Sequence, residues 1–599
     1  MQRPLTRGGS FFFVWLALSL PLILYAFTRT GGGTTAGVAP ANFVAAAPSS
    51  VPLKDSAGGS VPLKDSAPPA ESLRGTPPPL QRLGHSTRVA DTTPASCVAD
   101  AAAPLAPGAA SPSVPLWKLA PPGLPIRERR FLIALDAQLP LALRCATSPA
   151  RILIAGLGGC ATSRDYTAAL NSARVLRLAA PWVDLVIEDV ACNEAAAAAV
   201  ASMGATATSG AAGGDFDALI LRRGDDGDAG ARATAAFGRI RDGGVLILEG
   251  FSDVVNGQQE LTKSLNSVKW GMHCAANGCS WNPQLFGSGP IFMARAKAVD
   301  CVRDWCAVYT WSRAEKASQS SDGVKALISR APQVVSARAL ERSANKCTPE
   351  RQDSVLFWTL GLVAGTDKVY NPDARGNTHY YHEPYARHFG PRRCGIASVL
   401  EIGLGCDMHY DPGAAFSPYL DYFPFAHIAY MEYDATCVDK FNREDPKRLT
   451  ATHGRERWSL VAGDQRNAAH LLAVSAPRGG ADWDIVIDDG GHSMGMQVTS
   501  LRVLLPHVSP GGFYVLEDFH TSWIEWVAKD GQGGVLTTDY VDEIAALLHN
   551  PTSTLPTNLN PAQFDGVVEL AALTKALSCS PQVCIFTRWT EDERKFLEE

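Results

Sequence analysis

The sequence has no excess of basic residues, because 54 Lys and Arg stand against 60 Asp and Glu, a formal net charge of −6. Proteins that bind nucleic acid usually carry a basic surplus, so nucleic-acid binding is not expected. The 14 cysteines include no C-x2-C pair, which argues against a zinc site. There is also no Asn-x-Ser/Thr acceptor with x other than proline, so N-glycosylation gives no support for a secretory route.

The clearest long apolar run is Phe11 to Phe27, seventeen uncharged residues preceded by Arg3 and Arg7 and followed by Arg29. At about 1.5 Å per residue it reaches about 26 Å, the short end of a membrane span. We interpret residues 1–30 as a cytosolic tail and signal anchor, which would make the chain a single-pass type II membrane protein of the Golgi or ER lumen. The alternatives are secretion after cleavage and a plastid-type leader.

Residues 31–123 are rich in Ala, Pro, Gly and Ser and contain almost no aromatic side chain. An eight-residue segment occurs twice there, at 50–57 and 60–67. Such a composition buries too little apolar surface to offset the entropy of ordering, so we predict a disordered stalk.

Three pairs of cysteines lie five residues apart, at Cys274 and Cys279, Cys301 and Cys306, and Cys579 and Cys584. In a lumenal protein these pairs would form disulfides, whereas buried free thiols are the alternative for each pair.

Strand-like and helix-like runs alternate twice after residue 123, which predicts an α/β fold with parallel strands. The first series of strand-like runs is 151–159, 183–189, 216–221 and 243–250, and the second is 398–405, 428–432, 483–489 and 511–518. We therefore predict two Rossmann-like domains in tandem, 124–338 and 339–599. A chance likeness between two common α/β domains is the alternative.

A nucleoside cofactor is indicated by the ends of the first strands of the second half. Glu401, Gly403 and Gly405 form a strand-end turn where the backbone can approach a ligand, and Glu432 ends the next strand, where a carboxylate can bind ribose hydroxyls. The third glycine of G-x-G-x-x-G is missing, which argues for a cofactor without a pyrophosphate, such as S-adenosylmethionine.

A further strand-like run of the same half, 458–462, is followed by Asp464 and Gln465. A carboxylate and an amide at this edge of the sheet can read an adenine base, so we predict that both residues contact the cofactor.

Acidic residues gather at the ends of the last two strands of that half. Asp489 ends one strand, and Glu517 and Asp518 end the other. Three carboxylates at one sheet edge repel each other unless a cation neutralises them, so we predict a Mg²⁺ site with these ligands. His492 follows closely and is the candidate general base, with His520 as second candidate.

With these motifs the second half resembles the metal-dependent sugar O-methyltransferases of macrolide biosynthesis, of the mycinamicin and macrocin type. The resemblance runs from Gly365 to Trp526, and the interval of 28 residues between Asp489 and Glu517 matches the family. The shared motifs are 365–368, 379–382, 385–389, 399–405, 463–465, 488–492 and 505–518. The resemblance to this family implies Mg²⁺ and S-adenosylmethionine as cofactors and His492 as the general base. It implies the same metal-binding and cofactor-binding residues that we assigned above.

When the two halves are aligned strand by strand, the first half differs at the site positions. Ile154 lies opposite Glu401, Arg222 opposite Asp489 and Gly250 opposite Asp518. Glu188 and Glu249 persist. An arginine at a metal position repels the ion. The first half is therefore predicted to be a non-catalytic copy that serves dimerisation or acceptor recognition.

The sequence thus predicts a membrane-anchored O-methyltransferase that acts on a sugar hydroxyl of a glycan or glycoside. A homo-oligomer of this chain is one of the assemblies that we consider. Two alternatives stay open: a catalytically inactive glycan-binding scaffold, and a plastid or cytosolic enzyme acting on a small metabolite.

Overall fold

The computed structural model describes most of the chain from Pro115 onward. The described residues are 115–139, 150–155, 170, 173–177, 183–188, 194–208, 215–222, 229–249, 272, 295–303, 305–349, 355–374, 378–406, 408, 411–475, 482–523, 537–549 and 563–599. The predicted anchor and nearly all of the predicted stalk lie outside these ranges and stay predictions. Within the ranges, we find no helix that combines the length and apolar character needed to cross a membrane.

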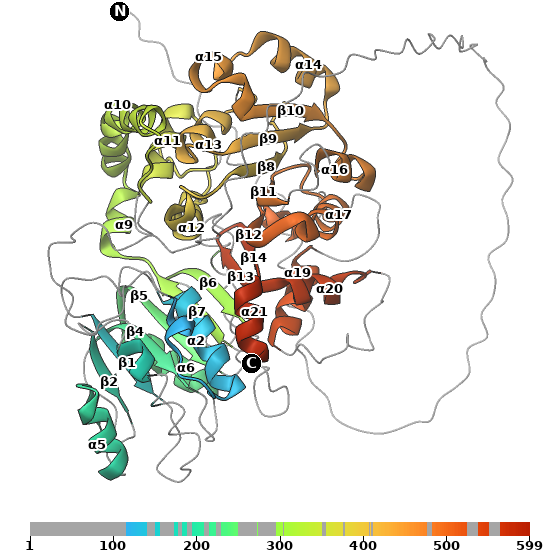
Figure 1. The fold of residues 1–599 in the computed structure, drawn as a ribbon. Helices are drawn as coiled ribbons and strands as arrows, with labels where there is room; N and C mark the ends of the chain where they lie inside the picture. The colour runs from blue at the N-terminus through green and yellow to red at the C-terminus, as the bar shows by residue number, and fades with distance from the viewer. Residues whose placement is uncertain are drawn as a thin grey trace, which may run out of the picture. The chain divides into compact units, whose positions relative to one another are not determined.

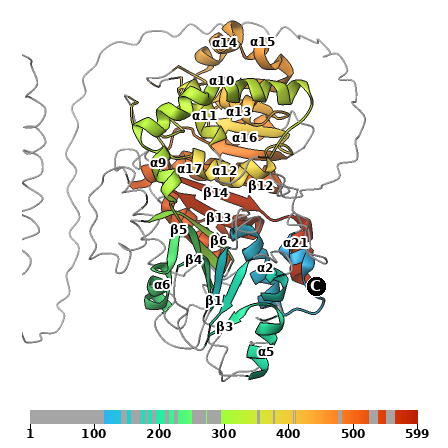
Figure 2. The ribbon, with the colours of Figure 1, turned by 90° about the vertical axis from the view of Figure 1, so that its left-hand side faces the viewer.

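The described strands form one sheet of fourteen, in the order β10-β9-β8-β11-β12-β14-β13-β6-β7-β5-β4-β1-β2-β3 (Figures 1 and 2). The strands of the first half are β1 (Arg151–Ala155), β2 (Asp184–Ile187), β3 (Thr206–Ala207), β4 (Phe216–Leu221), β5 (Ile240–Glu249), β6 (Ala296–Val302) and β7 (Trp305–Thr310). Those of the second half are β8 (Ser398–Ile402), β9 (His427–Glu432), β10 (Trp458–Ala462), β11 (Trp483–Asp488), β12 (Val508–Leu516), β13 (Thr574–Ser580) and β14 (Val583–Arg588). The α/β prediction is confirmed.

Each half has the same strand order when it is read inward from its outer edge. Five parallel strands come first, in the order third, second, first, fourth, fifth, and an antiparallel hairpin follows, β7 with β6 or β14 with β13. The halves join where β6 pairs with β13 in antiparallel register, with Cys301 opposite Leu577. One continuous sheet therefore runs through both halves, a feature that local sequence patterns do not predict.

Disulfides cross-link both hairpins. Cys301–Cys306 joins β6 to β7, and Cys579–Cys584 joins β13 to β14, so two of the three cysteine pairs with a spacing of five are bonded. The pair Cys274 and Cys279 lies outside the described residues. Cys347–Cys394 and Cys406–Cys437 are also bonded, across separations of 47 and 31 residues that gave no signal in the sequence.

Helices cover both faces of the sheet, as expected when both faces of parallel strands are apolar. In the first half they are α2 (Ile126–Gln138), α5 (Glu194–Ser202), α6 (Ala229–Phe237) and α9 (Arg313–Ser318). The next helices are α10 (Ser321–Ser343), α11 (Leu356–Ala364), α12 (His382–Phe389), α13 (Phe416–Tyr422), α14 (Ala435–Glu444), α15 (Leu449–His453), α16 (Ala468–Ser475), α17 (Met494–Leu504), α19 (Thr537–His549), α20 (Val567–Leu573) and α21 (Glu591–Glu598). Figure 1 shows α10, α11 and α13 on one side of the second-half strands and α16 and α17 on the other.

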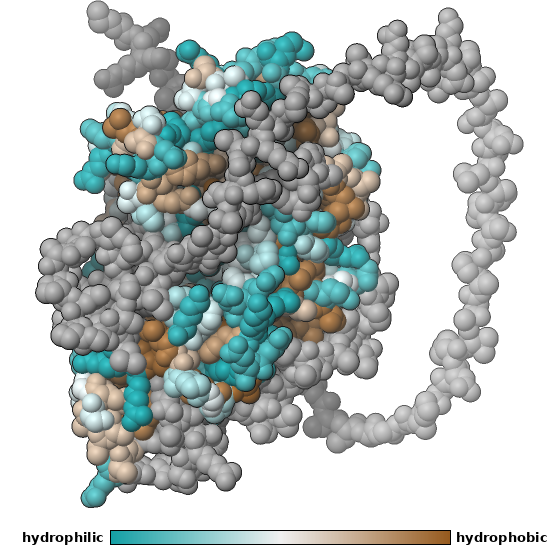
Figure 3. All heavy atoms as spheres, in the orientation of Figure 1, coloured by the Kyte–Doolittle hydropathy of each residue, from teal (hydrophilic) through white to brown (hydrophobic). Residues whose placement is uncertain are grey.

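The core of the second half has two layers, one on each face of the sheet. Val399 and Ile485 belong to the layer under α11 and α13, whereas Leu400 and Val486 belong to the layer under α17 and α19. On the outside, α14 buries Val438 and leaves a polar surface, which appears as the hydrophilic region over α14 and α15 in Figure 3. Because these strands are parallel, their carboxyl ends, and therefore the side chains of the site, lie at one edge of the sheet.

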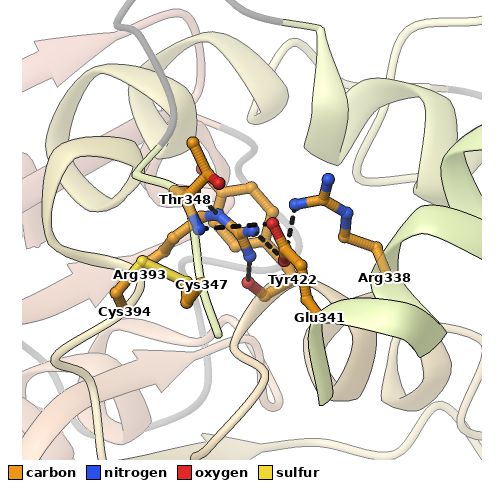
Figure 4. Close-up of a disulfide and its surroundings, with 7 residues drawn as sticks. All are labelled: Arg338, Glu341, Cys347, Thr348, Arg393, Cys394 and Tyr422. Carbon is orange, nitrogen blue, oxygen red and sulfur yellow. Dashed lines mark hydrogen bonds and ion pairs between the residues drawn. A yellow bond between two sulfur atoms is a disulfide. The ribbon is translucent and has the colours of Figure 1, made fainter. Parts of the chain in front are cut away.

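The helix α10 crosses the boundary that we predicted between residues 338 and 339. Its residues Val324 and Leu327 pack in the core of the second half, so the helix joins that half from its first turn. Its C-terminal end is fastened by Arg393, a fully buried side chain that donates to the carbonyl of Thr348 (2.9 Å) and pairs with Glu341, beside the disulfide Cys347–Cys394 (Figure 4). The division into domains stays a prediction.

Candidate active site

A cavity of about 330 Å³ lies at the carboxyl ends of β8, β9 and β11. All of the residues predicted to bind the cofactor line it: Glu401, Gly403, Gly405, Glu432, Asp464 and Gln465. Asp489, His492 and Asp518 line it as well, whereas Glu517 does not. The structure therefore brings the predicted cofactor residues and most of the predicted catalytic residues into one cavity.

The turn after β8 depends on glycine. Gly403 has a φ of +96°, and a Cβ atom there would lie 2.1 Å from the carbonyl oxygen of Asp489, so no other residue fits without moving the backbone. The next residue after the turn, Cys406, is bonded to Cys437 of α14. The backbone of β11 thus approaches the glycine turn closely, and the disulfide holds the turn at the cavity.

The two glutamates of this region are fixed by hydrogen bonds. Glu432 accepts from the backbone N–H of Leu404 (2.8 Å) and of Asp434 (3.0 Å), so its carboxylate is held across the glycine turn. Glu401 is buried at the end of β8 and accepts from the Tyr430 hydroxyl (3.0 Å). Burial raises the pKa of Glu401 to about 7, against the lowering effect of the nearby Lys368 ammonium.

Asp464 and Gln465 differ in what they offer to a ligand. Asp464 pairs with Arg466 (2.9 Å) at the rim of the cavity, and hydrogen bonds from Arg466 lower the pKa of Asp464. Gln465 is buried, and its amide donates to Asp488 (2.6 Å) and accepts from the Gly491 N–H (2.9 Å). The structure therefore gives Gln465 the role of a brace for the turn after β11, and its contact with the cofactor stays a prediction.

Asp488 and Asp489 lie side by side at the end of β11 in different environments. Asp488 is buried and accepts from the Tyr514 hydroxyl (3.0 Å), and burial raises the pKa of Asp488 to about 6. Asp489 lines the cavity instead. The alternation of side chains along a strand explains the difference, and it leaves Asp489 as the acid available for a ligand.

Lys368 supplies a positive charge that the sequence analysis did not assign. Its ammonium group lies 2.6 Å from Asp489 and 3.3 Å from Glu401, and it also pairs with Glu517. Burial lowers the pKa of Lys368, but the surrounding carboxylates outweigh it and raise that pKa well above its ordinary value. Lys368 was visible only as part of the motif 365–368, and it is 121 residues from Asp489 in sequence.

Glu517 lies beneath the cavity and has no solvent exposure. It pairs with Lys368 and accepts a hydrogen bond from the Tyr385 hydroxyl. Among the described residues, the group whose ligand atoms converge within 4.8 Å is Asp489, His492 and Asp518. Two carboxylates and an imidazole suit a divalent ion, so the donor set fits a metal, with two of the three predicted ligands in it.

Asp518 is surrounded by imidazoles. It lies 3.4 Å from Nε2 of His492 and 3.7 Å from Nδ1 of both His379 and His520, and it accepts from the Tyr381 hydroxyl (2.5 Å). Burial raises the pKa of Asp518, but the imidazoles outweigh this effect and hold it below its ordinary value.

His492 is held in an unusual backbone conformation at the cavity. Its φ is +57°, its carbonyl accepts from the Thr521 hydroxyl (2.8 Å), and its buried Nδ1 has no hydrogen-bond partner among the described residues. Positive φ values at non-glycine residues cluster at functional sites, and Asp518 has a φ of +49°. The structure thus brings the predicted base to the predicted metal ligands.

No protein-family model matches the chain. Mycinamicin VI 2''-O-methyltransferase of Micromonospora griseorubida is 34% identical over 158 residues, 26% of this chain and 35% of that protein. The 8-demethyl-8-(2-methoxy-alpha-L-rhamnosyl)-tetracenomycin-C 3'-O-methyltransferase of Streptomyces olivaceus is 34% identical over 168 residues, 28% of this chain and 37% of that protein. This chain is similar to sugar O-methyltransferases. The resemblance expected from the motifs is confirmed, and the chain spans little more than a third of the length of these relatives.

A solved structure, the methyltransferase MycE from the mycinamycin biosynthetic pathway in complex with Mg and SAH, matches 40% of this chain and 55% of that chain. Its identity is 25% and the TM-score is 0.29.

After β4 and at the end of β5, the first half has a buried ion cluster. Arg222 forms two hydrogen bonds with Glu128 (2.6 and 3.0 Å) and pairs with Glu249 (3.0 Å), and all three side chains are buried. Burial raises the pKa of Glu249, but Arg222 and Arg127 outweigh it and lower that pKa to about 2. Arg222 thus neutralises Glu249, and the other acid that persists in this half, Glu188, pairs with Arg239 (2.7 Å).

Proposed function

We propose that the chain is an S-adenosylmethionine- and Mg²⁺-dependent O-methyltransferase that acts on a sugar hydroxyl of a glycan or glycoside, with its active site in the second half. One observation carries the proposal. The residues predicted to bind the cofactor share a cavity with Asp489, His492 and Asp518. The identity to sugar O-methyltransferases over about a quarter of the chain supports the same activity.

The cofactor end of the cavity would hold the methyl donor through groups that the protein fixes in advance. Glu432 is oriented by two backbone N–H groups, and Gly403 lets the glycine turn pack closely against the backbone of Asp489 at the cavity. When bound, S-adenosylmethionine supplies an electrophilic methyl group on its sulfonium. Fixed groups of this kind act by positioning the two reactants, which is the main requirement of a methyl-transfer displacement.

At the other end, Asp489 and Asp518 would hold the divalent ion. When bound, the ion lowers the pKa of an acceptor hydroxyl. His492 would take the proton of that hydroxyl on Nε2, which lies 3.4 Å from Asp518.

We also propose that the chain contains two methyltransferase-type halves in tandem, of which the first is non-catalytic. The matching strand orders of the two halves support the tandem arrangement. The replacement of metal ligands by the ion cluster around Arg222 supports the loss of catalysis in the first half.

We propose further that Phe11 to Phe27 anchors the chain in a membrane and that the folded part faces an oxidising lumen. Four disulfides among the described residues support such a compartment, since disulfides are rare in the cytosol. Protease protection of the C-terminal part in intact vesicles is the expected result, and complete digestion without detergent would exclude the lumenal location.

The proposed activity is tested on the full chain with methyl-labelled S-adenosylmethionine, Mg²⁺ and a panel of glycosides that includes mycinamicin VI and simple rhamnosides. Mg²⁺-dependent transfer of label to a sugar hydroxyl, abolished by EDTA, is the expected result. Calorimetry with S-adenosylhomocysteine runs in parallel. Absence of cofactor binding would refute the enzyme proposal and favour the scaffold alternative.

A further inference from the structure

The junction of the two halves contains a cluster of buried charges. We call it the junction cluster: Lys297 and Asp300 of β6, and Glu383 and Arg387 of α12. The Lys297 ammonium lies 3.3 Å from Glu383, and the Arg387 guanidinium lies 3.6 Å from Asp300 and 3.3 Å from Glu383. Each of the four side chains is at most 13% exposed. The first half thus supplies one cation and one anion to a helix of the second half.

The opposite side of the same helix contacts the candidate metal site. Tyr381, at the N-terminal end of α12, donates to Asp518, and Tyr385 donates to Glu517. Tyr381 and Tyr385 are four residues apart and share a face of the helix. Glu383 and Arg387 are offset from them by two residues, about 200° around the axis, and therefore occupy the other face. The helix lies between the junction cluster and the acids of the site.

A helix of eight residues has little stability of its own, so its orientation depends on what it packs against. Buried charges must meet partners, because an unpaired buried charge is strongly unfavourable. Glu383 and Arg387 find partners on β6, and both also contact the Ser580 hydroxyl of β13. The placement of α12 in the structure satisfies both the junction cluster and the tyrosine contacts to Asp518 and Glu517.

We propose that the first half acts as a positioning element for the active site, and that Lys297 and Asp300 are its positioning residues. They act through α12, which sets the tyrosine hydroxyls that orient Asp518 and Glu517. This inference rests on the proposed function, because it assumes that these acids belong to a site for a divalent ion. It gives the non-catalytic half a role in catalysis that requires no ligand of its own.

The test is calorimetric titration of Mg²⁺ into the full chain saturated with S-adenosylhomocysteine, for the wild type, Lys297→Met and Asp300→Asn. Changing a residue that supports a metal ligand typically weakens ion binding tenfold or more, so we expect about a tenfold loss in both variants. The affinity for S-adenosylhomocysteine should stay within about twofold, because Glu401 and Glu432 lie on other strands. Lys297→Arg keeps the cation and should restore ion binding.

The matched control is Glu315→Gln, which removes the other acid that pairs with Lys297 (Figure 2 shows α9, the helix that carries it). Glutamine can still accept the hydrogen bond from the backbone of Ser312, so the start of α9 is preserved. The contacts of Glu315 are with Lys297 and the start of its own helix, so this variant should bind Mg²⁺ like the wild type.

Three outcomes would overturn the inference. The first is wild-type Mg²⁺ affinity in both Lys297→Met and Asp300→Asn. The second is an equal loss of Mg²⁺ and S-adenosylhomocysteine affinity in these variants, which indicates general unfolding. The third is a loss of Mg²⁺ affinity in Glu315→Gln as large as in Lys297→Met. If Lys297→Met does not fold, the near-isosteric Asp300→Asn decides. A wild-type chain that binds neither Mg²⁺ nor S-adenosylhomocysteine would refute the proposed function itself, and the inference with it.

Discussion

Asp489→Asn is the substitution that probes the candidate metal site most directly. The side chains of Asp489 and Asp518 are only 19% and 16% exposed, and their ligand atoms lie within 4.8 Å of one another. At an effective dielectric constant near 20, two negative charges at this distance repel by about 3 kcal/mol. Binding of a divalent ion removes this repulsion in the wild type. In the asparagine variant the repulsion is absent even without an ion, because one of the two charges has been removed.

The stability of the variant without ion should change little. Asparagine still offers an oxygen to the Lys368 ammonium, which lies 2.6 Å from Asp489, but the ionic part of that attraction is lost together with the repulsion from Asp518. The two changes oppose each other, so we expect the free energy of unfolding to stay within roughly 1 kcal/mol of the wild type. The fold would therefore remain intact in the inactive variant.

The response to Mg²⁺ separates the two proteins. At an ion concentration of 100 times Kd, a ligand that binds only the folded state stabilises it by about 2.7 kcal/mol, which should raise the Tm of the wild type by several degrees. Asp489→Asn should show no such rise, and its methyl transfer should fall by at least about a thousandfold. Asp482→Asn changes a half-buried acid just before β11, which pairs with Arg588 and not with the site, and should respond like the wild type. A variant at Asp489 that gains the full Tm shift, or turns over near the wild-type rate, would refute the metal site.

Three further substitutions test other parts of the structure. His492→Ala should lower kcat by about 10² to 10⁴-fold while Mg²⁺ affinity is kept, as expected of a general base; an equal loss of ion affinity, measured by calorimetry, would identify the imidazole as a ligand instead. Gly403→Ala should abolish binding of S-adenosylhomocysteine, because its Cβ would lie 2.1 Å from a carbonyl oxygen, whereas Gly395→Ala, which meets nothing closer than 3.6 Å, should bind normally. Glu249, with a pKa lowered from 4.5 to about 2, should contribute roughly 3 kcal/mol of stability that is present above pH 4.5 and is lost as the pH falls toward 2. The difference in Tm between wild type and Glu249→Gln should therefore shrink over that range, and a difference that does not change with pH would contradict the assignment.

Local patterns in the sequence located most of the candidate site. The strand-like runs end at Glu401, Glu432 and Asp489, and the structure places these residues at the carboxyl ends of β8, β9 and just after β11. This worked because apolar runs and glycine turns are local signals, and because parallel strands present their carboxyl ends at one edge. Their roles in binding and catalysis stay predictions until the substitutions are measured.

The sequence could not show which charges would meet across the fold. Lys368 was visible as part of a motif, but its contacts with Asp489 and Glu517 join residues 121 and 149 positions apart. The same limit applies to Gln465, whose hydrogen bonds with Asp488 and Gly491 the sequence did not indicate.

By itself, the sequence determined most of the parallel strands, the glycine turn and the acids at the strand ends, since each depends on neighbours along the chain, but it did not indicate the hairpins β6–β7 and β13–β14. Only the tertiary structure decided that Glu517 lies beneath the cavity with Lys368, and that β6 pairs with β13 to bring Lys297 and Asp300 against α12. The physical reason is that burial and pairing of charges depend on which surfaces meet after folding. These contacts join residues far apart in the chain, and no periodic pattern in the sequence indicates them.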